Sequence, residues 1–285
     1  MDMQTAILLI SCPDQKGITA KISNFIYQNN GNIEHADQHI DNQTNTFFMR
    51  IEWSLKGFRI PKEEITSEFS KLAIKFKMKY QLSFSSEIQR AAIFVSQHTH
   101  CLYDLLLRRE EGQLRCNFPL IISNHSDAKK IADNFKIKFC QFKVKKGNKQ
   151  ETEKKIIELL KKEKIDLIIL ARYQQILSKN FVNLFTNRII NIHHSFLPAF
   201  VGENPYGQAY RRGVKIIGAT SHYVTQELDA GPIIEQDTAR ISHRDSLDDL
   251  KMKGCDLEKI VLGRAVRLHL DRKILVYNNK TVIFD

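Results

Sequence analysis

The chain carries the stretch IINIHHSFLP at residues 189–198, and this stretch decides the class of fold. It opens as a short apolar run and ends in amide, imidazole and hydroxyl groups before Pro198. A short apolar run of this kind is typical of a buried strand in a parallel sheet. In open α/β sheets, ligands bind beyond the carboxyl ends of such strands. Asn191 and His193 stand at that end, so we expect a functional site there.

Similar apolar runs alternate with helical stretches from residue 91 onward. The pattern predicts strands at 91–96, 116–123, 138–142, 167–171, 189–192, 215–224 and 233–240, and a final hairpin of 273–277 with 281–284. It predicts helices at 101–111, 128–134, 151–162, 179–185 and 247–270. This alternation indicates a doubly wound, mainly parallel, Rossmann-like α/β domain.

The first 84 residues have a different rhythm. Apolar or alternating runs predict strands at 5–11, 32–41, 46–53 and 79–84. Apolar side chains at helical spacing predict one helix from Ile18 and another after Pro61. The order β-α-β-β-α-β is that of the ferredoxin-like fold. We therefore expect domains at residues 1–84 and 91–285, joined by a polar linker at 85–90.

Composition narrows the class of protein. The chain has 285 residues, 42% of them hydrophobic, and a net charge of +11. It contains no apolar run long enough for a membrane helix and no signal-peptide pattern at its start, and its five cysteines are widely spread. We expect a cytoplasmic protein with free thiols and no membrane contact. The basic excess favours solvated lysines on helix faces over nucleic-acid binding, because no compact motif combines basic residues with exposed aromatics.

A second motif, GATSHYVTQELDAGP at residues 218–232, supplies a carboxylate. Attack on a carbonyl group builds negative charge on oxygen, which Asn191 and His193 could stabilise as donors. Asp229 could act as the base for an attacking water, directly or by orienting it. Each residue has a plainer alternative, since Asn and Asp commonly form turns and a lone His is commonly structural. Their joint occurrence favours catalysis.

The two motifs together resemble the active site of the folate-dependent formyltransferases. That resemblance implies catalytic roles for Asn191, His193 and Asp229, with His222 and Ser195 in support. It also implies that the pteridine ring of the folate is bound, largely through main-chain groups, by Arg172, Tyr173, Gln174, Gln175, Ile176 and Leu177. The alternative for this segment is a simple strand-to-helix turn. No metal and no cofactor beyond the substrate 10-formyltetrahydrofolate is expected.

The loop at residues 13–18, in its β-α-β-β-α-β setting, resembles that of the ACT domains. These are small regulatory folds that bind amino acids. The resemblance implies an effector site at Asp14, Gln15, Gly17 and Ile18, with glycine and methionine as opposing effectors. It also implies a homo-oligomer, because ACT domains commonly pair. The alternative is a tight turn in which Asp14 caps the helix.

The acceptor of the formyl group is the remaining question. The loop at residues 96–102 has no glycine, which disfavours the backbone phosphate cradle of a ribonucleotide transformylase. Along its whole length the chain instead resembles the formyltetrahydrofolate deformylases. That implies hydrolysis to formate and tetrahydrofolate, with formate supplied to purine synthesis. The alternatives are transfer to an amine and a non-enzymatic folate or amino-acid sensor.

Two positions depart from the related families. Gly207 stands where the deformylases usually carry histidine, and we expect it to loosen a loop. Gln175 stands where the transformylases carry arginine, so contacts with the glutamate tail of folate are expected to differ.

Overall fold

The computed structural model describes residues 4–144, 147–199 and 204–284. They form two compact units. Of the described residues, the first unit contains 4–88, 271–277 and 282–284, and the second contains 89–270 and 278–281. Both predicted fold classes are confirmed.

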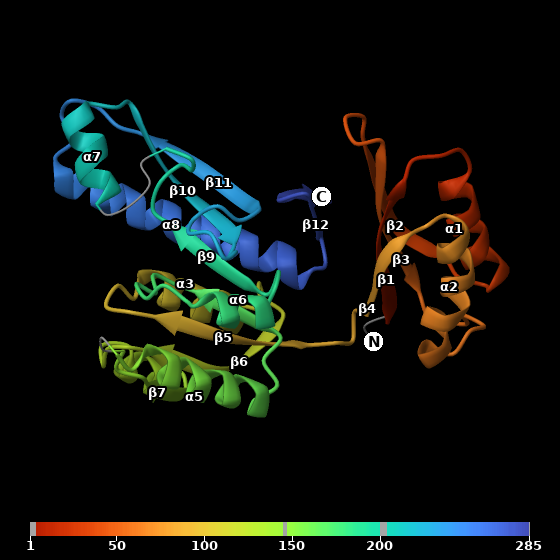
Figure 1. Ribbon diagram of the computed structural model, residues 1–285, viewed down its shortest axis with the longest axis horizontal. Coiled ribbons are helices and arrows are strands. Elements are labelled where there is room, and N and C mark those ends of the chain that lie inside the picture. The colour runs from red at the N-terminus through yellow and green to blue at the C-terminus, as the bar shows by residue number, and fades with distance from the viewer. Residues whose placement is uncertain (1–3, 145–146, 200–203, 285) are drawn as a thin grey trace. The chain divides into compact units, whose positions relative to one another are not determined.

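The first unit is built on a four-stranded sheet of order β2-β3-β1-β4, with all neighbours antiparallel. Helices α1 and α2 lie on the same face of it (Figure 1). Its elements are β1 (Thr5–Pro13), α1 (Ile18–Gln28), β2 (Ile33–Asp41), β3 (Thr46–Ser54), η1 (Lys62–Glu64), α2 (Ile65–Lys75) and β4 (Lys79–Phe84). This is the predicted β-α-β-β-α-β order.

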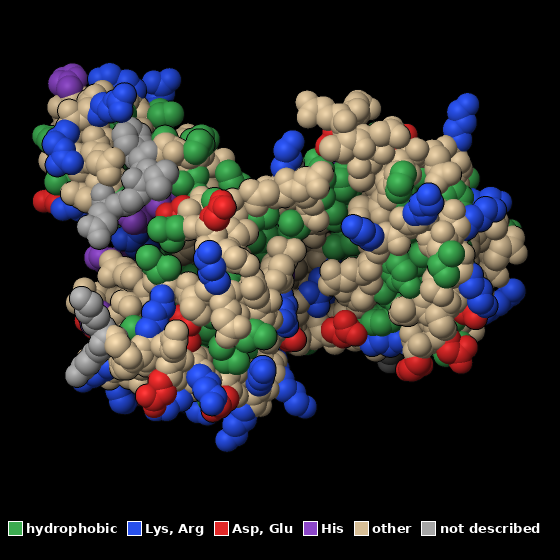
Figure 2. Space-filling view, viewed as in Figure 1, with side chains coloured by type: hydrophobic (Ala, Val, Ile, Leu, Met, Phe, Trp, Pro, Cys, Tyr) green, Lys and Arg blue, Asp and Glu red, His purple; other side chains and the backbone are tan. Residues whose placement is uncertain are grey.

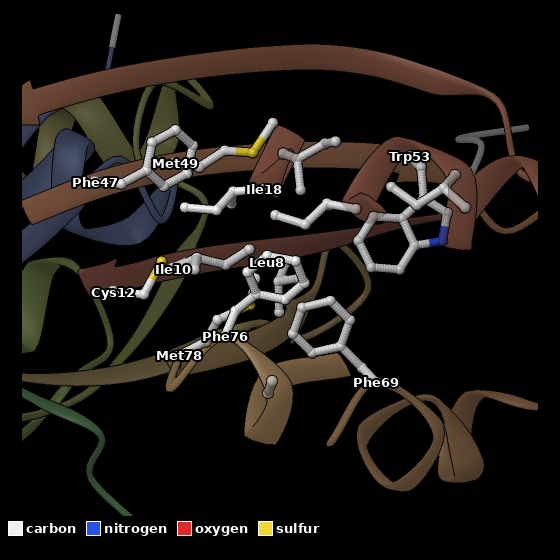
Figure 3. Packing of buried hydrophobic residues seen from close by; sticks show 14 of the residues in the cluster. Leu8, Ile10, Cys12, Ile18, Phe47, Met49, Trp53, Phe69, Phe76 and Met78 are labelled. Carbon is white, nitrogen blue, oxygen red and sulfur yellow. The ribbon is translucent and has the colours of Figure 1, made fainter. Parts of the chain in front are cut away.

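Side chains alternate between the two faces of this sheet, and apolar side chains pack on both faces. Leu8 and Ile10 point toward the helices and pack with Ile18 and Phe69 in the main core (Figure 3). Leu9 points to the opposite face. There it packs with Phe48, Val282 and Phe284, and with partly buried side chains of β12 (Ile274–Tyr277).

Those contacts explain one difference from the sequence-based domain limits. Residues 271–277 and 282–284 were expected in the second domain but belong to the first unit, because their apolar side chains cover its second sheet face. In addition, β5 begins at Gln89, inside the segment expected to be a linker.

The turn before α1 does not use Asp14 as a cap. The N-cap residue is Gly17, which has φ 91° and makes no side-chain cap hydrogen bond. A positive φ of this size suits glycine, which has no Cβ to clash with the backbone. The plainer alternative for the loop, helix capping by Asp14, is therefore wrong.

The second unit is built on a seven-stranded sheet of order β11-β10-β9-β8-β5-β6-β7. Strands β5 to β9 are parallel, and β10 and β11 extend the sheet in antiparallel fashion. Its strands are β5 (Gln89–Val95), β6 (Cys116–Ser123), β7 (Lys138–Gln141), β8 (Leu167–Leu170), β9 (Ile189–His193), β10 (Ile216–Tyr223) and β11 (Ile233–Arg240). Strand β13 (Lys280–Ile283) pairs with β12.

Helices cover both faces of this sheet (Figure 1). They are α3 (His100–Glu110), α4 (Lys129–Asn134), α5 (Lys149–Lys162), α6 (Lys179–Leu184), α7 (Pro205–Arg212) and α8 (Leu247–Leu270). Helices α5 and α6 pack on one face through a core that includes Phe94 and Phe181. Helix α8 packs on β9, β10 and β11 and against α3. Strand order reverses between β5 and β8, so the crevice for a ligand opens there.

The surface agrees with the plainer interpretation of the charge. Figure 2 shows Lys and Arg side chains spread over the visible face and interspersed with Asp and Glu. Several form helical ion pairs, including Lys129 with Asp133 and Lys155 with Glu151. None of the described helices has the length and apolarity needed to cross a bilayer.

Helix α7 was not predicted, and it changes the interpretation of Gly207. The side chain of Asn204 accepts a hydrogen bond from the Gly207 backbone N–H at 3.1 Å and caps the helix. A Cβ on Gly207 would lie 2.5 Å from Nδ2 of Asn204. Gly207 therefore makes room for the cap, and the expectation of a loosened loop is wrong.

Candidate active site

Strand β9 presents Asn191 and His193 on the same face, because side chains two residues apart in a strand point the same way. Strand β10 lies beside them, with His222 opposite Asn191 in the register. Nδ2 of Asn191 lies 3.2 Å from Nε2 of His222, and Nδ1 of His222 lies 3.0 Å from the carbonyl of Tyr223. The carbonyl of Tyr223 thus fixes the orientation of the His222 ring, and Nε2 of that ring faces the amide of Asn191.

The carboxylate arrives from the loop between β10 and β11. Oδ2 of Asp229 lies 3.3 Å from Nδ1 of His193, and Oδ1 lies 3.7 Å from Nε2 of His222. The loop turns tightly. A Cβ on Gly231 would lie 1.8 Å from the carbonyl oxygen of Tyr223, so only glycine fits there. Asn191, His193, His222 and Asp229 are thus brought together as the sequence predicted.

The charge of Asp229 follows from its surroundings. Burial raises the pKa of Asp229, but hydrogen bonds and charge attraction from His193 and His222 outweigh it and hold the pKa below its ordinary value. Asp229 is therefore ionised near neutral pH. His193 is 6% exposed, and its Nε2 has no hydrogen-bond partner among the described residues. One imidazole edge thus faces a carboxylate, and the other is buried without a hydrogen-bond partner among the described residues.

Comparison with known proteins agrees with this arrangement. The sequence profile of the family described as formyl transferase matches residues 89–266, and that of the ACT domain matches residues 6–73. The formyltetrahydrofolate deformylase of Synechocystis sp. is 56% identical over 284 residues, covering 100% of both chains. The chain belongs to the formyltetrahydrofolate deformylase family.

Solved structures give the same relationship. A formyltetrahydrofolate deformylase from Pseudomonas syringae has a TM-score of 0.97 and 43% identity, covering 100% of this chain and 96% of that one. A glycinamide ribonucleotide transformylase from Symbiobacterium toebii has a TM-score of 0.68 and 27% identity, covering 72% of this chain and 98% of that one. The resemblance to these deformylases includes the first unit as well.

Ser195, predicted to support catalysis, closes the turn after β9. Its hydroxyl donates to the carbonyl of Ala199 at 2.8 Å. Thr220 and Gln236, which sequence reasoning missed, fix the same segment. The hydroxyl of Thr220 donates to the carbonyl of Ser195 and accepts from the backbone N–H of Leu197, while Nε2 of Gln236 donates to the carbonyl of Leu197.

The segment predicted to bind folate lies at the switch point of the sheet. It follows β8, and the backbone N–H of Gln174 donates to the hydroxyl of Ser96, the residue directly after β5. The ring of Tyr173 packs edge-on against Phe94 in the core, and burial raises its pKa to about 12. That ring is part of the core, so Tyr173 has only its main chain to offer a ligand. Gln174 and Ile176 are exposed, whereas Arg172, Gln175 and Leu177 are half-buried.

A second polar cluster was missed altogether. Glu258, on α8, is 1% exposed. One carboxylate oxygen accepts from the hydroxyl of Tyr206 and the other from Nε2 of His100, both at 2.7 Å. The guanidinium of Arg172 lies 3.4 Å away. The ring of His194 links the two clusters, with its centroid 5.3 Å from that of His193 and 5.8 Å from that of Tyr206.

The charges in this cluster disfavour a metal. His100, Cys101 and Glu258 place donor atoms within 4.8 Å of one another, which is metal-like spacing. Burial lowers the pKa of His100, but hydrogen bonds, among them that to Glu258, raise it to about 12. Burial raises the pKa of Glu258, but His100 and Arg172 outweigh it and keep it below its ordinary value. Two cationic groups therefore already neutralise the carboxylate, and a metal ion would be repelled.

Proposed function

We propose that this chain hydrolyses 10-formyltetrahydrofolate to formate and tetrahydrofolate. The observation that carries the proposal is the meeting of an ionised Asp229 with His193, whose Nε2 has no partner, beside the amide of Asn191. The family to which the chain belongs supports the same reaction. Formate released in this way would be available to purine synthesis.

In the proposed mechanism, a water oxygen bonds to the formyl carbon and the carbonyl electrons move to the formyl oxygen. Nε2 of His193 and the free N–H of the Asn191 amide donate to that oxyanion. The tetrahedral intermediate then collapses, and the bond to the folate nitrogen breaks. One proton of the water passes to that nitrogen, and the other stays on the formic acid that forms. The formic acid then ionises, so the products are tetrahydrofolate, formate and a proton released to solvent.

Asp229 has three roles in this scheme. Because its pKa lies below the ordinary value, it is a weak proton acceptor near neutral pH. It also orients the water, and it holds the His193 ring in place through Nδ1 while the oxyanion forms. The water becomes strongly acidic as its oxygen bonds to the formyl carbon, so even a weakly basic Asp229 can then accept its proton and pass it to the folate nitrogen.

The test is an incubation of the full chain with 10-formyltetrahydrofolate and no amine acceptor. Equimolar formate and tetrahydrofolate are expected, and Asp229→Asn is expected to lose at least about 100-fold in kcat. Turnover that requires an added amine would move the chain to the transferases. Folate binding without turnover under any condition would favour a sensor.

The first unit is proposed to bind an amino-acid effector, with glycine and methionine as the candidates, and to pair with a second copy of the chain. The N-terminus of α1, opened by Gly17, offers backbone N–H groups to a carboxylate, beside Asp14, Gln15 and Ile18. Calorimetric titration with each amino acid tests this, and Gly17→Ala is expected to weaken binding because φ 91° strains alanine.

Five free cysteines are consistent with the proposed cytoplasmic location.

A further inference from the structure

The turn at residues 278–281 lies against the loop that carries Asp229, and both belong to the second unit. Nδ2 of Asn279 donates to the carbonyl of Ala230 at 2.9 Å. Oγ1 of Thr281 donates to the carbonyl of Ile233 at 2.6 Å. The first hydrogen bond holds the residue directly after Asp229, and the second holds Ile233, the first residue of β11, where the loop ends.

The loop needs such restraints because one side of it is open. A cavity of about 550 Å³ is bordered by Asp229, Leu197 and Pro198, and by turn residues 279–281. Atoms that border a cavity lack packing partners on that side. Asp229 also has φ 54°, a left-handed conformation that is unfavourable for a non-glycine residue. Such a conformation persists only where the surrounding structure enforces it.

We propose that Asn279 and Thr281 are positioning residues that hold the Asp229 carboxylate against His193 during turnover. The proposal rests on the role given above to Asp229. The two side chains act through the main chain of Ala230 and Ile233 and are not assigned any contact with the reacting atoms. A displacement of about 1 Å at a reacting group can cost about 100-fold in rate. Loss of either hydrogen bond is therefore expected to lower kcat by allowing the carboxylate to move.

The turn offers matched control variants. Asn278 and Asn279 have φ of 42° and 59°, so glycine fits at both positions. The side chain of Asn278 makes no hydrogen bond within the described part of the chain, whereas that of Asn279 bonds to Ala230. Asn279→Gly therefore removes the hydrogen bond to Ala230, and Asn278→Gly alters only the conformational freedom of the backbone. At Thr281, valine keeps the shape and removes the donor, while serine keeps the donor.

The experiment compares these variants in the full chain. Asn279→Gly and Thr281→Val are expected to lose about tenfold in kcat for formate release, with KM changed by less than about threefold. Asn278→Gly and Thr281→Ser are expected to stay within about twofold of the unmodified chain. Hydrogen exchange across residues 226–233 should rise in Asn279→Gly and Thr281→Val and in neither control variant. This measurement is independent of activity.

An equal loss of kcat in Asn278→Gly would overturn the proposal, as would unchanged exchange at 226–233 in Asn279→Gly. A lower melting temperature with normal kcat per folded chain would give the turn a purely structural role and also overturn it. Asp229→Asn separates this idea from the proposed function. If that variant is inactive while Asn279→Gly is fully active, only the positioning role fails. If Asp229→Asn stays active, the role of Asp229 itself fails.

Discussion

A single carboxylate, Asp229, organises the charges around β9. It faces His193 and His222 at 3.3 and 3.7 Å. It stays ionised because these partners outweigh the cost of its burial. His194, the next residue along the chain from His193, behaves in the opposite way. Burial lowers its pKa to about 3, and the positive charge of Arg172 adds to that effect, so this imidazole stays neutral.

The neutral His194 predicts a specific dependence of stability on pH. At a pH below 6.5, the ordinary pKa of this side chain, His194 takes up a proton in the unfolded chain. In the folded chain it does so only near pH 3, because its pKa is lowered to about 3. The free energy of unfolding therefore falls as pH drops below about 6.5, by roughly 1 kcal/mol per pH unit. His194→Gln removes this contribution.

Urea unfolding of both proteins at pH 7.5, 6.5 and 5.5 measures the difference, because other titrating groups cancel in the comparison. Between pH 6.5 and 5.5, the unmodified chain is expected to lose about 1 kcal/mol more than His194→Gln. Parallel losses in the two proteins would mean that His194 is protonated in the folded state.

Helix α8 positions Glu258, and its sequence shows how closely helices meet in this unit. A Cβ on Gly254 would lie 2.1 Å from the hydroxyl oxygen of Tyr206. That hydroxyl donates to the buried Glu258 carboxylate, so the absence of a side chain at Gly254 lets α7 approach α8 closely enough for the bond to form. A glycine inside a helix costs about 1 kcal/mol relative to alanine, and here the hydrogen bond offsets that cost.

Gly254→Ala is therefore expected to destabilise the chain by about 1–3 kcal/mol, although alanine is the better helix former. In a Tyr206→Ala background the clash is gone, and the same substitution should become neutral or stabilising. Thermal and urea unfolding of the four proteins in this cycle measure the coupling. Stabilisation by Gly254→Ala in the unmodified chain would contradict the packing described for α7 and α8.

Across the whole chain, local patterns predicted what depends on local chemistry. Alternation and helical spacing gave both fold classes, and polar residues at the ends of apolar runs located Asn191 and His193. Helix α7 was not predicted because Pro205 and Gly207 are typical of loops. The cap from Asn204 stabilises the helix that they begin.

The Glu258 cluster and the hydrogen bonds from Asn279 and Thr281 were not predicted, for a different reason. They join residues far apart in sequence, with separations of 158 for His100 and Glu258 and 49 for Asn279 and Ala230. Contacts of that range leave no periodicity in the sequence for either partner. They depend on how sheet, helices and C-terminal turn come together, which the structure alone provides.

The most direct test of the account is a single turnover of 10-formyltetrahydrofolate in ¹⁸O-labelled water, with formate analysed by mass spectrometry. Attack by water on the formyl carbon predicts formate carrying one ¹⁸O atom, equimolar with tetrahydrofolate, and almost no such product from Asp229→Asn. Unlabelled formate, or a formyl group recovered on another acceptor, would contradict water as the acceptor. Full labelling at a normal rate in Asp229→Asn would contradict the role given to that carboxylate.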